Sequence, residues 1–225
     1  MGLVIGVQSH QVVCQVFRWG KLRDTVHVPL AEQGAWEAAL QGCLAQHALP
    51  RQAVTVYVGA PHMQWLLETW PLHVRTRQDF LAYLEYQASQ AFPRSKQAGA
   101  WQVGLDARAR MGDTLPIALL DPAFLQALTS RVQAHGNRLR SVQPLLQVCW
   151  QQAKKTRTVQ INQEGVLAFD EPNWLTMFGV REGGVVSVRS VRLNGLNHNV
   201  PGLAQHYAQS IGALAENVQC ISVGL

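Results

Sequence analysis

The sequence predicts an α/β protein made of two halves that share one layout. Three observations support this prediction. Apolar runs of strand length alternate with segments in which apolar residues recur every three or four positions, as they do on one face of a helix. Each half has a run of at least three expected strands, followed by a helix and a final strand. A polar, basic stretch at 153–157 separates the halves and interrupts the apolar periodicity.

The first half opens with three consecutive strands. Trp19-Gly20-Lys21 suits the hairpin turn between the second and third strands, because Gly tolerates the positive φ that such turns need. A helix over 31–47 ends at Pro50, and the strand that follows stops at Gly59 and Pro61. The expected strands are 3–8, 11–18, 22–28 and 53–59. Three strands, a helix and a strand make a ribonuclease-H-like half-domain.

A further α/β segment lies inside the first half. Thr76 is the expected N-cap of a helix over 79–91, which stops at Phe92-Pro93. Asp121-Pro122 starts a second helix, and His135-Gly136-Asn137 is its expected C-cap. Strands are expected at 98–106, 113–120 and 139–142, with a helix at 144–152. We therefore expect a first lobe over 1–152, with an inserted subdomain at about 72–138.

The second half is expected over 158–225, after a linker at 153–157. Glu182-Gly183-Gly184 marks a hairpin turn, and a helix is expected over 202–215. The expected strands are 158–162, 165–169, 174–180, 185–193 and 218–223. This half repeats the layout of the first half but not its sequence, and it is shorter.

The composition excludes several classes of protein. The chain has 225 residues, of which 48% are apolar, and this is typical of a globular protein. Its net charge of +5 is spread over the sequence instead of being concentrated on one helix, so we expect no nucleic-acid binding. The scattered cations, among them Arg18, Lys21 and Arg23, are compatible with an anionic membrane surface or an acidic partner, although their scatter favours an ordinary solvated surface.

The apolar runs and the cysteines point to the cytoplasm. None of the apolar runs approaches the roughly 20 residues that span a bilayer, and no signal peptide is evident, so we expect no direct membrane span in this chain. Membrane association would then run through a partner or a missing segment. Cys14, Cys43, Cys149 and Cys220 lie in apolar surroundings without a CxxC pair, as buried free thiols do in a reducing compartment.

The turn after the first strand lacks the chemistry of a nucleotide site. In nucleotide-binding folds that open this way, an acidic residue and small residues at this turn hold metal and phosphate. The turn here reads Gln8-Ser9-His10-Gln11, and the next acidic residue is Asp24. We expect the corresponding turn of the second half at Asn162-Gln163-Glu164-Gly165, where the hydroxyl residues are also missing. No nucleotide cofactor is therefore expected.

Other catalytic chemistry is also not expected. The eight histidines show neither HxxxH nor HExxH spacing, so no metal site is predicted. Ser9 and His10 are neighbours, and side chains of neighbouring strand residues point to opposite faces, so they do not form a nucleophile and its base. The Asp170-Glu171 pair precedes Pro172-Asn173 and is interpreted as part of a turn. The sequence predicts no catalytic residue.

Two tryptophans stand where the first lobe leads into the inserted segment. Trp65 and Trp70 flank Leu66-Leu67. Such aromatic residues either belong to a hydrophobic core or line a groove in which a partner peptide docks. Both interpretations stay open, and Trp65, Leu66 and Trp70 are the candidate protein-binding residues.

The stretch from Gln78 to Gln152 resembles a known family. It contains a helix ending in Phe92-Pro93, an aromatic strand at 101–105, a strand and helix at 118–125, and the segment His135-Gly136-Asn137 to Leu145. These features resemble the PilM-type proteins of type IV pilus assembly and the cytoplasmic domain of the type II secretion L protein. The PilM pattern has an Asp in its first phosphate turn, where this chain has Gln8. Because it lacks this Asp and has a shortened second lobe, the chain is more similar to the secretion L protein than to PilM.

The resemblance implies an actin-like fold, which is a duplicated ribonuclease-H-like fold, with an inserted α/β subdomain. It also implies a non-enzymatic scaffold at the cytoplasmic face of the bacterial inner membrane that links membrane components to the assembly ATPase. In PilM-type proteins a short segment of an inner-membrane partner is held near the junction that here contains Trp65. The chain could also form a homodimer. The alternatives are an actin-like ATPase whose metal carboxylate comes from Asp24, Glu164 or Asp170, and a small-molecule kinase of related fold.

Overall fold

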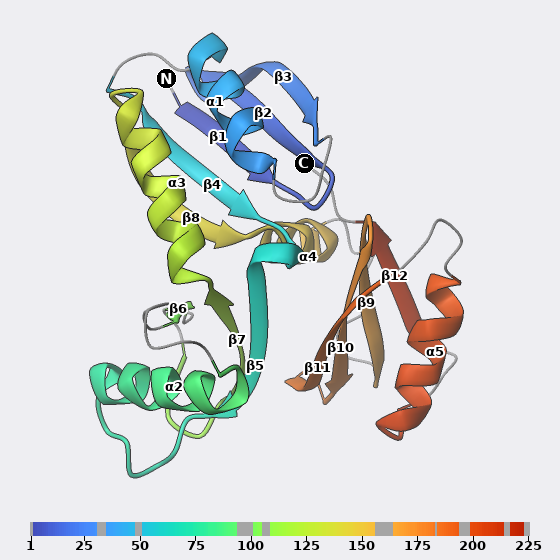
Figure 1. Ribbon diagram of the computed structural model, residues 1–225. Helices are drawn as coiled ribbons and strands as arrows, with labels where there is room; N and C mark the ends of the chain where they lie inside the picture. The colour runs from blue at the N-terminus through green and yellow to red at the C-terminus, as the bar shows by residue number, and fades with distance from the viewer. Residues whose placement is uncertain are drawn as a thin grey trace.

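The computed structural model describes most of the chain, and its strands form three sheets (Figure 1). The described residues are 2–30, 35–47, 51–93, 101–104, 109–155, 164–182, 184–193, 199–213 and 217–222. Within these ranges, no helix combines the length and the apolar composition needed to cross a bilayer.

Five strands form the first sheet, and two helices cover one of its faces. The strands are β1 (Gly2–Val7), β2 (Gln11–Arg18), β3 (Lys21–Pro29), β4 (Ala53–Val58) and β8 (Arg138–Pro144), and the helices are α1 (Trp36–His47) and α3 (Pro122–Ala134). Their order is β3-β2-β1-β4-β8, with β1 to β3 antiparallel and with β4 and β8 parallel to β1. Alternate residues of β4, beginning with Val54, pack against Leu40 of α1 and Leu128 of α3.

A second sheet is built in the same order. Its strands are β9 (Gly165–Glu171), β10 (Trp174–Arg181), β11 (Gly184–Arg192) and β12 (Val218–Ser222), and the neighbouring helices are α4 (Leu145–Lys155) and α5 (Val200–Ser210). The order is β11-β10-β9-β12, antiparallel as far as β9 and then parallel. β9 therefore corresponds to β1, β10 to β2 and β12 to β4, which confirms the predicted repetition of the layout.

A small sheet extends from the first sheet. It consists of β5 (Met63–Thr69), β7 (Thr114–Leu120) and β6 (Gln102–Gly104) in the order β5-β7-β6, and it packs against α2 (Arg77–Ala91). A 3-10 turn, η1 (Ala60–His62), leads from β4 into β5. The sequence analysis predicted no strand at β5, because the consecutive apolar residues Trp65, Leu66 and Leu67 hide the alternation of a strand. The segment is a strand because it pairs with β7 from Met63↔Leu120 to Thr69↔Thr114.

Other elements differ from the expectation mainly at their ends. α4 extends to Lys155, three residues into the expected linker, and Ala and Lys rank among the best helix formers. α5 ends at Ser210, five residues before the expected end at 215, and Gly212 just after it adopts a φ of +71°, which is not helical. The expected strand at 158–162 and the ends of the expected strand 98–106 lie outside the described residues. The proposed domain boundaries stay a prediction.

The cap of α2 gives a first test of how the sequence defines these elements. Thr76 Oγ1 accepts a hydrogen bond from the Asp79 amide at 3.1 Å, as predicted, and donates one to Asp79 Oδ2 at 2.7 Å. We expect Thr76→Ala to lower the free energy of unfolding by about 1 kcal/mol, because an amide of the first turn loses its partner. Urea unfolding measures the change. Thr76→Ser keeps the hydroxyl and serves as the control, and an equal loss in both variants would contradict a capping role.

Candidate functional site

The turn between β1 and β2 is closed by its own residues. The Gln8 side chain is fully buried, and its Oε1 accepts a hydrogen bond from Gln11 Nε2 at 2.7 Å. The Gln8 amide donates to the Gln11 carbonyl at 3.0 Å. Two of the four polar side chains of this turn, those of Gln8 and Gln11, therefore bind each other.

The corresponding turn of the second sheet meets this turn directly. Because β9 corresponds to β1, this turn lies after Glu171, the last residue of β9, and consists of Pro172 and Asn173. The sequence analysis had placed it at 162–165, one strand too early, because it counted the stretch 158–162 as the first strand of the second half. Ser9 Oγ donates a hydrogen bond to the Pro172 carbonyl at 2.5 Å. Equivalent turns of the two halves thus touch each other.

Glu171 bridges the two sheets at this point. Its Oε1 accepts a hydrogen bond from the Ser9 amide at 2.9 Å, and its Oε2 accepts one from the Ala60 amide at 2.8 Å. The side chain is only 3% exposed. Burial raises the pKa of Glu171, although the hydrogen bonds from Ala60 and Ser9 act in the opposite direction.

The carboxylate also fills the space in front of Gly59. A Cβ atom at Gly59, between β4 and η1, would lie 2.2 Å from Glu171 Oε1, so the close approach of this carboxylate to the backbone favours a glycine here. Backbone amides of turns and short helices are the groups that hold phosphate oxygens in proteins. Here two such amides are already satisfied by a carboxylate of the same chain.

The acidic residues that the ATPase alternative would use are not gathered around this contact. Glu164 pairs with Arg181 at 2.9 Å, and Asp24 lies 3.8 Å from His47 Nδ1. Asp170 is part of β9 and pairs with Leu175 across the sheet. Among the described residues, no group of three or more His, Cys, Asp or Glu side chains is placed to hold a metal ion.

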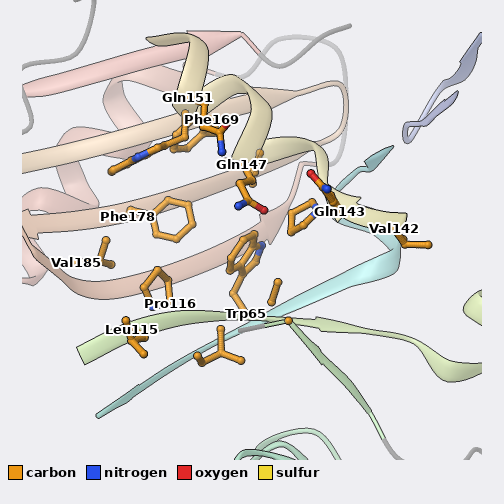
Figure 2. Close-up of a pocket in the computed structure, with 16 residues that line it drawn as sticks. Trp65, Leu115, Pro116, Val142, Gln143, Gln147, Gln151, Phe169, Phe178 and Val185 are labelled. Carbon is orange, nitrogen blue, oxygen red and sulfur yellow. The ribbon is translucent and has the colours of Figure 1, made fainter. Parts of the chain in front are cut away.

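A groove of about 790 Å³ lies where the three sheets approach each other (Figure 2). β5 and β7 contribute Trp65, Leu115 and Pro116, and the second sheet contributes Phe169, Phe178 and Val185. On the side of α4 the groove is lined by three exposed glutamines, Gln143, Gln147 and Gln151. The groove thus combines apolar walls with amide groups that both donate and accept hydrogen bonds.

Trp65 packs at the centre of this groove. Its ring meets Phe178 edge to face, with the ring centroids 5.3 Å apart. Its indole Nε1 is buried and finds no hydrogen-bond partner among the described residues. An unpaired buried donor costs free energy.

The other two predicted residues lie elsewhere. Trp70 stacks on Phe80 with centroids 4.3 Å apart, and its Nε1 donates to the Val74 carbonyl at 2.7 Å. Leu66 packs against the same cluster, on the face of the small sheet that α2 covers. Neighbours on a strand point to opposite faces, so Trp65 and Leu66 are separated by the sheet. The structure brings Leu66 and Trp70 together, but Trp65 alone of the three lines the groove.

The sequence analysis missed two features of these sites. It interpreted Asp170 and Glu171 as part of a turn, whereas both belong to strand β9, and it did not identify Glu171 as the residue that joins the sheets. It also did not single out the glutamines that line the groove, of which Gln147 and Gln151 are one helical turn apart. The spacing of four residues was the only available signal, and it is common on exposed helix faces.

Comparisons with known proteins agree on the fold. No family model matches the sequence, and no curated protein does. The cytoplasmic domain of EpsL, an inner membrane component of the type II secretion system of Vibrio cholerae, superposes with a TM-score of 0.57 at 11% identity and covers 98% of this chain and 82% of its own. A PilM-PilN type IV pilus biogenesis complex matches with a TM-score of 0.62 at 9% identity, over 96% of this chain and 67% of the other.

A third solved structure carries the fold in its description. A protein from Bacteroides thetaiotaomicron with actin-like ATPase fold and unknown function matches with a TM-score of 0.59 at 8% identity, over 93% of this chain and 75% of its own. At such low identity the likeness shows the fold alone. The chain has the actin-like fold, as its repeated layout of strands and helices and its resemblance to the pilus and secretion proteins predicted.

Proposed function

We propose that this protein is a non-enzymatic scaffold of a type IV pilus or type II secretion assembly, and that the groove at Trp65 holds a short segment of an inner-membrane partner. The observation that carries the proposal is the groove itself, which is open and apolar and contains a buried, unpaired indole donor. The fold it shares with EpsL and with the PilM-PilN complex supports the type of assembly.

The groove fits a peptide in extended conformation. Phe169 and Phe178 offer an apolar wall for alternate side chains, and the glutamine amides along α4 can bind a peptide backbone. β8 forms an edge of the first sheet in the described part of the chain, and Val142 and Gln143 at its end line the groove. A peptide strand beside β8 would find unpaired backbone groups there.

The contact at Glu171 supports the non-enzymatic part of the proposal. A nucleotide held between the sheets would need the amides that now bind this carboxylate. If a nucleotide took these amides, the Glu171 carboxylate would stay buried without hydrogen-bond partners, and the free-energy cost of this opposes nucleotide binding. The scaffold would act at the cytoplasmic face of the inner membrane, between the membrane component and the assembly ATPase.

The test of the groove is a peptide titration. Labelled peptides covering the cytoplasmic segments of the inner-membrane pilus and secretion components from the same organism are titrated with the protein, and fluorescence polarisation gives Kd. We expect one of them to bind, and Trp65→Ala to raise its Kd at least tenfold, because the central packing surface and the free donor are lost. Leu72→Ala, exposed on the small-sheet side, is the control and should leave Kd unchanged.

A second variant separates binding from folding. Gln147→Trp places a bulky side chain in the groove from an exposed position, so it should block the peptide without disturbing the core. Unchanged Kd in both Trp65→Ala and Gln147→Trp, or no binding by any peptide, would refute the groove as the site. Micromolar, magnesium-dependent binding of a labelled ATP analogue would refute the non-enzymatic part of the proposal.

A further inference from the structure

The hairpin of β2 and β3 ends in a turn of unusual composition. The last paired residues are Arg18 and Lys21, and only Trp19 and Gly20 connect them. Trp19 has a φ of +55° and Gly20 a φ of +74°. Two-residue turns with positive φ at both positions favour Asn, Asp and Gly, and a large aromatic residue is out of place in this backbone region.

Trp19 is also the most exposed large apolar side chain in the described part of the chain. It is 86% exposed, and Leu22, two residues after the turn, is 51% exposed. An indole ring held in solvent gains nothing from the hydrophobic effect. Neither the turn conformation nor packing within the chain accounts for a tryptophan at this position.

The charges around the turn add a third unfavourable feature. Arg18 and Lys21 are directly opposite each other, and like charges in this position repel. Arg23 follows on the same strand, and all three cations are exposed. Among the described residues none of them forms an ion pair, and the nearest acid along the hairpin, Asp24, faces His47. Binding of an anionic surface would remove this repulsion.

We propose that the tip of this hairpin docks on an anionic lipid bilayer. The Trp19 ring would enter the interfacial region, where indole rings are favoured, and Leu22 would lie beside it. Arg18, Lys21 and Arg23 would bind the headgroup phosphates. A bilayer fits better than an acidic protein, because the tip is a two-residue turn that combines one large, 86% exposed indole ring with exposed cations, the pairing of groups that the interfacial region of an anionic bilayer accepts.

This inference goes beyond the proposed function and does not depend on it. β3 forms one edge of the first sheet, while β8 and the groove are at the other edge (Figure 1). The hairpin tip and the groove can therefore be occupied at the same time. A protein that uses both would contact the membrane directly as well as through a partner segment.

The test is co-sedimentation of the full chain with vesicles of phosphatidylethanolamine and phosphatidylglycerol, with phosphatidylcholine vesicles for comparison. We expect binding to the anionic vesicles and at least tenfold weaker partitioning of Trp19→Asn. Because Asn suits the turn, this variant should unfold at the same temperature as the wild type or higher, which separates loss of binding from loss of folding. Leu72→Asn changes another highly exposed apolar residue, 76% exposed and on the small-sheet side, and should bind like the wild type.

A charge-matched pair tests the role of the cations. The double variant Arg18→Glu, Lys21→Glu should abolish vesicle binding. The double variant Arg75→Glu, Arg110→Glu changes the net charge by the same amount away from the tip and should keep most of the binding.

Fluorescence quenching identifies the residue that enters the bilayer. Brominated lipid should quench the tryptophan fluorescence of the wild type but not that of Trp19→Phe, which isolates one of the seven tryptophans. No binding of the wild type, equal binding of Trp19→Asn and Leu72→Asn, or equal loss in both charge pairs would overturn the proposal. The proposal would also be overturned if the wild type did not bind vesicles but bound an acidic protein, and Trp19→Asn lost that protein.

Discussion

Gly59→Ala is expected to lower the free energy of unfolding by about 3 kcal/mol. The backbone at Gly59 is extended, with φ −80° and ψ 176°, so alanine suits it and causes no conformational strain. The cost arises from the new methyl group, which would lie 2.2 Å from Glu171 Oε1. The carboxylate would have to leave the amides of Ser9 and Ala60, and each lost hydrogen bond to a charged group costs about 1.5–3 kcal/mol, part of which water recovers.

A double-mutant cycle shows whether the carboxylate causes this loss. In the background of Glu171→Ala there is no carboxylate to displace, so Gly59→Ala should then cost less than about 1 kcal/mol. Urea unfolding of the four proteins gives the coupling energy, expected at about 2 kcal/mol. Equal costs of Gly59→Ala in both backgrounds would contradict the contact between the two sheets as described.

This contact also shows what a single sequence leaves undetermined. The central strands of the two large sheets follow from the apolar pattern, because β1, β4, β9 and β10 bury alternate or continuous apolar side chains. Glu171 and Ser9 are 162 positions apart, and no local pattern predicts that they bind. Their meeting depends on how two sheets pack, which is a tertiary property. The same holds for the second turn, whose position became clear only when β9 was seen to correspond to β1.

The candidate binding residues show a related limit. The sequence analysis selected Trp65, Leu66 and Trp70 by composition, without assigning β5 as a strand. Once β5 is a strand, alternation alone places Trp65 and Leu66 on opposite faces. An apolar run of this length fits a buried strand or part of a helix, and only pairing with β7 decides between them. The turn at Trp19 was predicted, whereas the exposure of its side chain required the structure.

A marked loss of stability in mild acid is the second large effect we expect, and His62 is its source. The His62 ring stacks on Phe124, with centroids 4.2 Å apart, and meets Trp36 edge to face. Burial lowers the pKa of His62 to about 4, against an attraction from Asp121 that raises it. The folded protein therefore holds this imidazole neutral under conditions in which the unfolded chain binds a proton.

The sign of the effect follows from this difference. Below a pH of about 6.5 the unfolded state takes up a proton that the folded state refuses, so stability falls as the pH falls and levels off near the folded pKa. A depression from 6.5 to about 4 corresponds to roughly 3 kcal/mol when the pH is well below both values. The lowered pKa of His10 acts in the same direction, whereas the raised pKa of Glu171 stabilises the folded state as that carboxyl takes up its proton.

His62→Phe isolates the contribution of one residue from these opposing effects. Phenylalanine keeps the stack on Phe124 but cannot take up a proton, so the variant should lose roughly 2–3 kcal/mol less than the wild type between about pH 7 and pH 4.5. Urea unfolding at both pH values measures this difference, in which the contributions of His10 and Glu171 cancel. Parallel stability profiles of the two proteins would mean that the imidazole is protonated in the folded state, and the stack would then be a cation on an aromatic face instead of a neutral core contact.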